Sequence, residues 1–211
     1  FCTLNPLANN TTLTFSNGNN TVYDTDNNWR SAFGSFAPNS GKWYFEVKRV
    51  GSSSNTWIGI MDTEQLDDGA YKFVSKSRGY GYSAGGEKGN SGSETAWGNT
   101  YAQNDIIGVA MDLDNSKLYF HKNGTYENSG VPTSGSTGTG SMYNLTSGFN
   151  YYPATALYST SAGVSFNFGQ GFFGTTAVAS ANADGNGVGA FEYAVPSGYY
   201  ALSTKNIKDF G

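Results

Sequence analysis

Large apolar residues alternate with polar ones at a period of two along this sequence, and no long window keeps a helical period uninterrupted by glycine or asparagine. In residues 42–48, Trp43, Phe45 and Val47 fall on one side of an extended chain, whereas Glu46 falls on the other side. This pattern predicts a half-buried antiparallel strand with an aromatic core face and a polar outer face. The chain as a whole is predicted to be β throughout.

Further short segments with strand patterning recur between turn signals. They are residues 57–61, 79–82, 107–113, 117–120, 154–158, 164–168 and 200–202. Asp114-Asn115 predicts the turn of a hairpin, and Asn123-Gly124 predicts a second turn, of type I′. The 29 glycines, five prolines and 16% aromatic residues fit a chain of many short strands joined by tight turns. The sequence therefore predicts an all-β sandwich or barrel.

The length of 211 residues permits one large domain or two small ones. Two stretches rich in small residues, 134–141 and 174–189, are predicted to be surface insertions. Because strand patterning continues to residues 200–202 with no linker, we expect a single domain over residues 1–211. The chain begins with Phe1 and not with methionine, so we expect a processed chain or a piece of a longer protein.

The charge balance narrows the range of partners. Twelve basic and 16 acidic residues give a net charge of −4 and an isoelectric point near 4.9. Binding to nucleic acid or to an anionic membrane is not expected, because both need a basic surface. No run of 18 or more apolar residues is present, so membrane insertion is not expected, and the N-terminus lacks a signal-peptide pattern. The remaining expectation is an uncharged or weakly charged ligand.

Several segments follow one another in an order and spacing that resemble those of a known family. They are residues 41–47 (GKWYFEV), 57–60 (WIGI), 79–82 (GYGY), 104–114 (NDIIGVAMDLD), 118–124 (LYFHKNG), 152–154 (YPA) and 164–170 (VSFNFGQ). Over about residues 41–172 the chain resembles a SPRY domain. This resemblance implies an all-β fold, a bent two-sheet antiparallel β-sandwich of the concanavalin-like jelly-roll type, which is used for recognition.

The two flanks extend the resemblance. Residues 1–7 and 196–206 are similar to segments that bracket SPRY domains in tail-fibre and other virion proteins of bacteriophages. The resemblance implies that the chain belongs to a longer virion protein and lies on the phage tail or capsid surface, outside the cell. In that family a cysteine often stands at the position of Ser203, so this chain lacks the partner with which Cys2 would pair.

Enzymatic activity is not expected, and no catalytic residue is assigned. The only histidine, His121, lies on the strand face opposite Leu118 and Phe120, and we expect it to be exposed and not to serve as a catalytic base. A glycan hydrolase, the alternative enzyme, needs two carboxylates that flank a sugar. The candidate carboxylates lie in a polar loop, which is more typical of a solvated surface. They are Asp62, Glu64, Asp67 and Asp68.

No cofactor and no metal site is assigned. A lone Cys2 excludes an intrachain disulfide and a zinc site built from cysteines. Residues 182–187 (NADGNG) space side-chain oxygens as in the first half of a calcium loop. The second half departs from that pattern, because the closing glutamate would fall at Tyr193 and Glu192 stands one residue short. Whether residues 182–187 bind calcium is left open.

The resemblance and the composition leave several functions. The first is a non-catalytic recognition domain of a phage virion or tail-fibre protein that binds a host-surface glycan or protein. The second is a structural domain that decorates the virion, contacts other virion proteins and forms a homo-oligomer through sheet edges or flat faces. A glycan hydrolase on a lectin-like sandwich is the third. An ordinary eukaryotic SPRY adaptor is a fourth, which the phage-like flanks disfavour.

Candidate ligand-binding residues come from loops rich in tyrosine, tryptophan and small polar residues, the composition of adaptable binding surfaces. Aromatic rings offer faces on which sugars stack, and polar neighbours offer hydrogen bonds. The candidates are Asp67, Tyr71, Lys88, Asn90, Trp97, Tyr101 and Tyr126. The alternative for Trp97 and Tyr101 is that both pack beneath their own loop.

Overall fold

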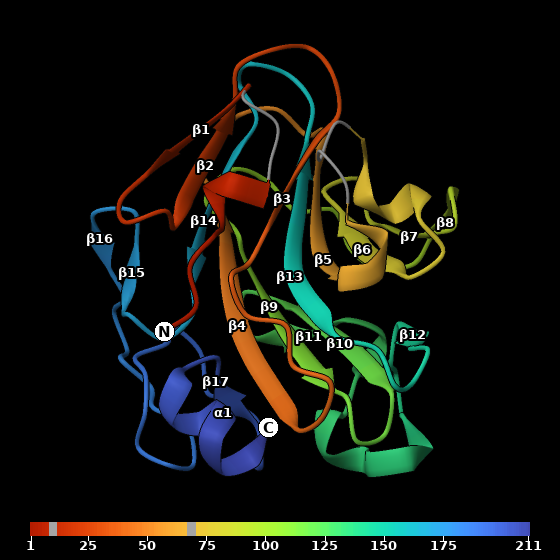
Figure 1. Cartoon of the computed structure of the whole chain (residues 1–211), viewed down its shortest axis with the longest axis vertical. Coiled ribbons are helices and arrows are strands. Elements are labelled where there is room, and N and C mark those ends of the chain that lie inside the picture. Colours follow the sequence, from red (N-terminus) through yellow and green to blue (C-terminus); the bar gives the residue numbers. More distant parts are fainter. Residues whose placement is uncertain (9–11, 67–70) are drawn as a thin grey trace.

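The computed structural model describes residues 1–8, 12–66 and 71–211. In this part of the chain the strands form a nine-stranded sheet, a six-stranded sheet and a two-stranded hairpin (Figure 1). The nine-stranded sheet contains β1 (Leu13–Ser16), β2 (Thr21–Asp24), β14 (Gly163–Asn167), β4 (Lys42–Arg49), β9 (Ile106–Asp112), β10 (Lys117–Lys122), β11 (Thr125–Tyr126), β12 (Tyr143–Asn144) and β17 (Tyr200–Ala201). The six-stranded sheet contains, in order, β3 (Arg30–Phe33), β13 (Tyr151–Leu157), β5 (Thr56–Asp62), β6 (Gly79–Ser83), β7 (Glu87–Asn90) and β8 (Ser93–Ala96).

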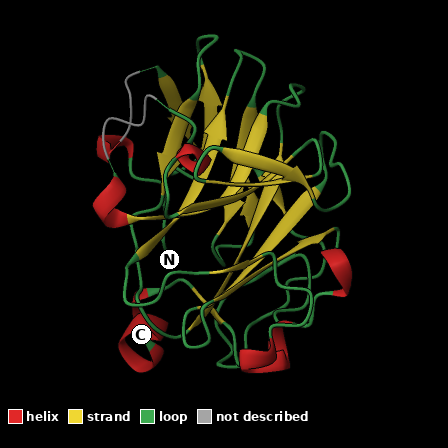
Figure 2. Ribbon diagram, turned by 90° about the vertical axis from the view of Figure 1, so that its right-hand side faces the viewer, coloured by secondary structure: helices red, strands yellow, loops and turns green. Residues whose placement is uncertain are grey.

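The remaining elements are short and lie at the periphery (Figure 2). They are the hairpin β15 (Phe172–Phe173) with β16 (Thr176–Ala177), the 3-10 turns η1 (Pro6–Ala8), η2 (Thr63–Gln65), η3 (Phe73–Ser75), η4 (Glu127–Ser129) and η5 (Pro132–Thr137), and the helix α1 (Thr204–Phe210). Within the described residues, no helix is long and apolar enough to cross a membrane.

The two large sheets confirm the predicted antiparallel β-sandwich. Their strand pairs are antiparallel, except that β17 runs parallel to β4. Every strand segment predicted from residues 42–168 is present, with boundaries shifted by a few residues. Trp43 and Phe45 lie fully buried between the sheets, as the alternation predicts. The Phe45 ring packs on the rings of Phe166 and Phe168, with centroids 6.1 and 5.7 Å away.

The outer face of the nine-stranded sheet is covered by a C-terminal segment, residues 182–202, which we call the C-terminal cover. Its Phe191 packs against Tyr44 of β4, with ring centroids 5.1 Å apart. The Glu46 carboxylate accepts hydrogen bonds from the backbone N–H groups of Glu192 and Tyr193, at 2.9 and 2.8 Å. Apart from β17, which pairs with β4 in the sheet itself, the cover therefore adds a third layer to this side of the sandwich.

A second carboxylate, that of Asp184, holds the cover to the end of the chain. One of its oxygens accepts hydrogen bonds from the N–H groups of Asn186 and Val188, both at 2.9 Å. The other accepts from the N–H of Ala201 at 2.9 Å and from the side-chain amide of Asn206 at 2.8 Å. The oxygens of Asp184 are thus used within the chain, so the loop at 182–187 serves as a structural clamp.

The cover makes two predictions wrong. Glu46 and His121 were expected on an exposed face, but they are 0% and 1% exposed because the cover lies over them. The all-β fold is confirmed, and the one short α-helix of the described residues, α1, follows Ser203, whose hydroxyl accepts the N–H of Asn206 at 3.2 Å. Alternation predicted the face of the strand correctly, but could not show that a distant segment covers it.

The outer face of the six-stranded sheet is covered in a different way. Phe73 and Val74 of η3 are fully buried against it, in a cluster with Phe33, Trp57 and Met61. This cover is an apolar plug, and it reaches only part of the sheet: every residue of β8, at the free edge, is exposed.

The hairpin turn predicted at Asn123-Gly124 is confirmed. Both residues have positive φ, 49° and 85°, as a type I′ turn requires. The turn joins β10 to β11, which pairs Lys122 with Thr125 and His121 with Tyr126. It thereby presents a row of polar side chains at one end of the sandwich.

Candidate functional site

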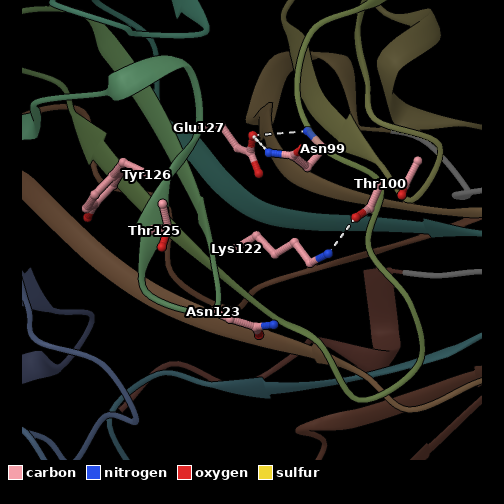
Figure 3. A pocket seen from close by; sticks show the side chains of 7 residues that line it. All are labelled: Asn99, Thr100, Lys122, Asn123, Thr125, Tyr126 and Glu127. Atoms are coloured by element: carbon pink, nitrogen blue, oxygen red, sulfur yellow. Dashed lines mark hydrogen bonds between the residues drawn. The ribbon is translucent and has the colours of Figure 1, made fainter.

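A pocket of about 320 Å³ lies where the β10–β11 hairpin meets the loop that follows β8 (Figure 3). We call it the Tyr126 pocket. Its lining consists of hydroxyl, amide, ammonium and carboxylate groups together with one aromatic ring. The lining residues are Asn99, Thr100, Lys122, Asn123, Thr125, Tyr126 and Glu127.

Glu127 fixes one wall of the pocket. Its carboxylate accepts hydrogen bonds from the backbone N–H and the side-chain amide of Asn99, at 3.0 and 2.9 Å (Figure 3). It also accepts from the Tyr82 hydroxyl at 3.2 Å. Burial and the charge of Glu127 raise the pKa of Tyr82, so this phenol stays protonated as a donor. The loop after β8 is thereby tied to the hairpin.

Lys122 fixes the opposite wall. Its ammonium donates to the backbone carbonyl of Thr100 at 2.8 Å and lies 3.2 Å from Asp105 (Figure 3). The amide of Asn123 donates to the same carboxylate at 2.7 Å. None of these bonds uses the hydroxyls of Thr100 and Thr125, so these two are the polar groups best placed to bind a ligand.

A buried hydrogen-bonded chain runs behind the pocket. The N–H of Gly124 donates to Nδ1 of His121 at 3.1 Å, so Nδ1 carries no proton and Nε2 does. Nε2 then donates to the Tyr44 hydroxyl at 2.7 Å, and that hydroxyl donates to Glu46 at 3.0 Å. Burial lowers the pKa of His121 to about 3 and raises the pKa of Glu46. The imidazole is neutral at physiological pH and connects the hairpin turn to the C-terminal cover.

Tyr126 lies between the pocket and the hydrogen-bonded side chains of His121, Tyr44 and Glu46. Its ring stands edge-on to His121, with centroids 5.2 Å apart. Its hydroxyl is buried, has no hydrogen-bond partner among the described residues, and points away from Lys122 and Asn99 (Figure 3). Burial, followed by the charge of Glu46, raises the pKa of this phenol. The pocket therefore meets the ring of Tyr126 more than its hydroxyl.

The structure brings only part of the predicted site together. Trp97 lies next to the pocket, half-buried, where its carbonyl accepts the Asn128 amide at 2.8 Å and its ring packs edge-on against Tyr82 and Phe120. Tyr101 is 2% exposed, and its hydroxyl donates to the backbone carbonyls of Thr56 and Tyr82. Tyr101 is therefore a core residue, and the prediction that it contacts a ligand at the surface is wrong.

The other predicted residues lie elsewhere. The Tyr71 ring faces Lys76 and Phe33 on the outer side of the six-stranded sheet. Lys88 of β7 lies over the Tyr143 ring, 5.4 Å from its centre. The Asn90 amide donates to the carbonyls of Ser77 and Gly79, both at 2.9 Å, and so supports the chain locally. Asp67 lies outside the described residues.

The acidic residues considered for a hydrolase serve structural roles where they are described. Asp62 is buried, forms an ion pair with Arg78 and accepts the N–H of Glu64. Glu64 contacts the same guanidinium at 3.2 Å. Asp68, like Asp67, lies outside the described residues. In the described ranges, no three histidine, cysteine or acidic side chains gather as a metal ion would require.

Sequence reasoning missed most of the pocket lining. Asn99, Thr100, Lys122, Asn123, Thr125 and Glu127 line the pocket and were not among the candidates. A signal existed for the hairpin half, because a type I′ turn projects the residues beside it at the end of a sheet. No comparable signal marks the loop after β8, whose position depends on the Glu127 carboxylate.

The comparisons with known proteins agree with this architecture. The chain matches the SPRY domain family over residues 42–171, more than half of its length, and it belongs to that family. It is similar to ATP-dependent RNA helicase DDX1 of Xenopus laevis, with 31% identity over 103 residues, which are 46% of this chain and 12% of that protein. The crystal structure of the SPRY domain of human HERC1 matches with a TM-score of 0.62 and 16% identity, over 77% of this chain and 96% of that one.

The family membership defines a class of function. SPRY domains are protein–protein interaction modules and are generally non-catalytic. The present chain spans only 12% of the curated relative, so the helicase activity in that relative's name describes the other protein. The phage setting indicated by the flanks stays a prediction.

Proposed function

We propose that this SPRY domain is a non-catalytic recognition domain of a bacteriophage virion or tail-fibre protein, and that it binds a glycan or protein on the host surface through the Tyr126 pocket. In this proposal the domain is displayed outside the cell, on the phage tail or capsid. The observation that carries it is the lining of the pocket, which combines hydroxyl and amide groups with one tyrosine ring.

Such a lining suits a ligand that is polar and uncharged. The hydroxyls of Thr100 and Thr125 can both donate and accept, as the hydroxyls of a sugar or the backbone of a peptide loop require. The Tyr126 ring supplies an apolar surface beside them. Because Glu127 and Lys122 already hold the walls by internal bonds, the ligand would meet a preformed site and little ordering would accompany binding.

A binding assay with matched variants tests this proposal. The purified chain is applied to a glycan array and to host cells, together with Thr100→Val and Thr125→Val, which remove a hydroxyl at nearly constant volume. Thr14→Val, at an exposed position on β1, is the control. We expect saturable binding that falls about 10-fold or more in the two pocket variants and not in the control, with Tm unchanged. Binding that is unaffected by both variants would place the site elsewhere.

A second candidate rests on the free sheet edge. All four residues of β8 are exposed, and β8 pairs only with β7 among the described strands. Unprotected edges favour strand pairing between copies, as a decorating or self-associating virion domain would use. Mass measurement in solution at increasing concentration tests this candidate, since a strict monomer would contradict it. Loss of binding to every surface, combined with oligomer formation, would favour it over recognition.

A further inference from the structure

A second pocket, of about 180 Å³, opens on the outer face of the six-stranded sheet, away from the Tyr126 pocket. We call it the Trp29–Trp57 pocket. Two indole rings and one net negative charge distinguish it from the Tyr126 pocket, whose lining has a single tyrosine ring and the balanced charges of Lys122 and Glu127. The lining residues are Trp29, Ser54, Asn55, Trp57, Lys72, Ser83, Gly85, Glu87 and Glu94.

The register of the strands explains why these side chains meet. Trp57 pairs with Ser83, and Gly89 pairs with Glu94, on neighbouring strands of one sheet. A Cβ at Gly89 would lie 2.6 Å from the Trp57 ring, so glycine is required for the indole to lie against β7. Glu87 of β7 and Glu94 of β8 are diagonal neighbours on the same face of the sheet. Long side chains at such positions are close enough to contact the same group.

The Lys72 ammonium shows which groups of the pocket bind a cation. Its ammonium lies 4.7 Å from the centre of the Trp29 ring and 5.1 Å from that of Trp57, both within the range of a cation–π contact. The same ammonium forms an ion pair with Glu94. The lysine comes from the chain segment just before η3, so the protein places a cation of its own between the two indoles.

One acidic group in the pocket is left without a positive partner. Among the described residues, no lysine or arginine lies within ion-pair distance of Glu87. One Glu87 oxygen accepts the Ser83 hydroxyl at 2.9 Å, and the side chain is only partly buried. With Lys72 opposed to Glu87 and Glu94, the lining carries one net negative charge.

We propose that the Trp29–Trp57 pocket binds an arginine side chain of a protein partner, which takes the place of the Lys72 ammonium between the two indoles. A planar guanidinium stacks on indole faces, and its fork of five N–H donors can reach both carboxylates at once, whereas the Lys72 ammonium pairs with Glu94 alone. Glu87, which has no ion-pair partner among the described residues, supplies a second carboxylate for the guanidinium. This site is independent of the Tyr126 pocket and can bind whether or not that pocket has a ligand.

The experiment uses the whole chain and the peptide acetyl-Gly-Arg-Gly-amide, with its citrulline counterpart as the matched ligand. Citrulline keeps the shape of arginine but has no charge. Binding is followed by tryptophan fluorescence and by two-dimensional NMR. We expect the arginine peptide to shift the indole signals of Trp29 and Trp57, and to bind about 10-fold more tightly than the citrulline peptide, which corresponds to 1.4 kcal/mol.

Variants separate the proposed replacement of Lys72 from simple charge attraction. Glu87→Gln should weaken binding of the arginine peptide several-fold, and Lys72→Met should strengthen it, because the internal competitor is removed. Lys88→Met is the control, since Lys88 lies on the opposite face of β7. Equal affinity for both peptides, no shift of either indole, or a loss of binding in Lys72→Met with Tm unchanged would each overturn the proposal.

Discussion

The outer faces of the two large sheets are both covered, but by different chemistry. Residues 182–202 lie over the nine-stranded sheet and are fastened by two buried carboxylates, Glu46 and Asp184, that accept backbone N–H groups. The η3 segment lies over the six-stranded sheet and is held by the burial of Phe73 and Val74. Hydrogen bonds can hold an irregular segment over a long stretch of sheet. The apolar plug covers only the part of the sheet that its buried side chains contact.

The difference decides where binding surfaces remain. On the nine-stranded side the cover lies over β4, β9 and β10, and the Tyr126 pocket lies beside the hairpin turn that follows β10. On the six-stranded side the plug leaves the strands near β8 open, and the Trp29–Trp57 pocket lies beside it. Each pocket thus opens where the cover of its sheet ends, and its lining comes from residues outside residues 182–202 and η3.

The largest expected effect compares the two covers directly. Phe191→Ala and Phe73→Ala each remove a fully buried ring from one cover, and we expect each to lower the free energy of unfolding by about 3–5 kcal/mol. Denaturant unfolding measures the loss. Hydrogen exchange should then show loosened amides in residues 182–202 for the first variant and in β6 and β7 for the second. A cost below about 1 kcal/mol for Phe191→Ala would contradict a tightly packed C-terminal cover.

The next largest effect is the pH dependence of folding stability, which tests the buried hydrogen bonds of His121 on the nine-stranded side. The folded pKa of His121 is about 3, below its value of 6.5 in an unfolded chain, so the unfolded state binds more protons between these values. Stability contributed by His121 is therefore complete above pH 6.5 and falls as the pH drops towards 3. We expect a loss of about 1–2 kcal/mol between pH 7 and pH 5, measured by denaturant unfolding.

Glu46 acts in the opposite direction. Burial raises the pKa of Glu46 in the folded state above its ordinary value of 4.5. Just above pH 4.5 the folded state therefore binds more protons than the unfolded state, so the contribution of Glu46 to folding stability rises as the pH falls. His121→Gln should therefore flatten the pH slope between pH 7 and pH 5, or reverse its sign. Slopes are compared, so a general loss of stability in the variant does not affect the test. An unchanged slope would show that His121 is not buried as a neutral group.

The smallest effect is a difference between two glycine variants, which measures how closely the C-terminal cover packs on the β10–β11 hairpin. Gly124 and Gly187 both have positive φ, 85° and 69°, so alanine at either should cost about 1–2 kcal/mol for the backbone alone. A Cβ at Gly124 would also lie 2.7 Å from the Tyr193 ring, whereas a Cβ at Gly187 meets nothing within 4 Å. Gly124→Ala should therefore lower Tm more than Gly187→Ala. Equal shifts would mean that Tyr193 moves aside freely.

The fold could be predicted where the strand is central and its pattern is strong. Trp43, Phe45 and Val47 identified β4 because both the alternation and the residue types agree. The strands β7 and β8 were missed, since their residues are Glu, Lys, Gly, Asn, Ser, Thr and Ala and show no apolar alternation. Their pairing depends on the neighbouring β6. The helix α1 was missed because it has only seven residues, most of them polar.

The site could be predicted only in part, for a related reason. The Asn123-Gly124 turn is local, so its type and place could be read from two residues. The buried state of Glu46 depends on residues 192 and 193, and the place of Asn99 depends on Glu127. Such contacts join segments far apart in the chain, and a single sequence carries no signal for them.

The hydrogen bond between Cys2 and Leu202 has a mechanical consequence. The N–H of Cys2 donates to the carbonyl of Leu202 at 2.8 Å, next to the short parallel pairing of β17 with β4 (Figure 1). We expect tension between these two residues to break this single bond and the two-residue pairing of β17 with β4 before the seven-residue antiparallel pairing of β4 with β9. In a domain pulled at these residues, we expect β17 and the cover joined to it to detach before the two sheets separate.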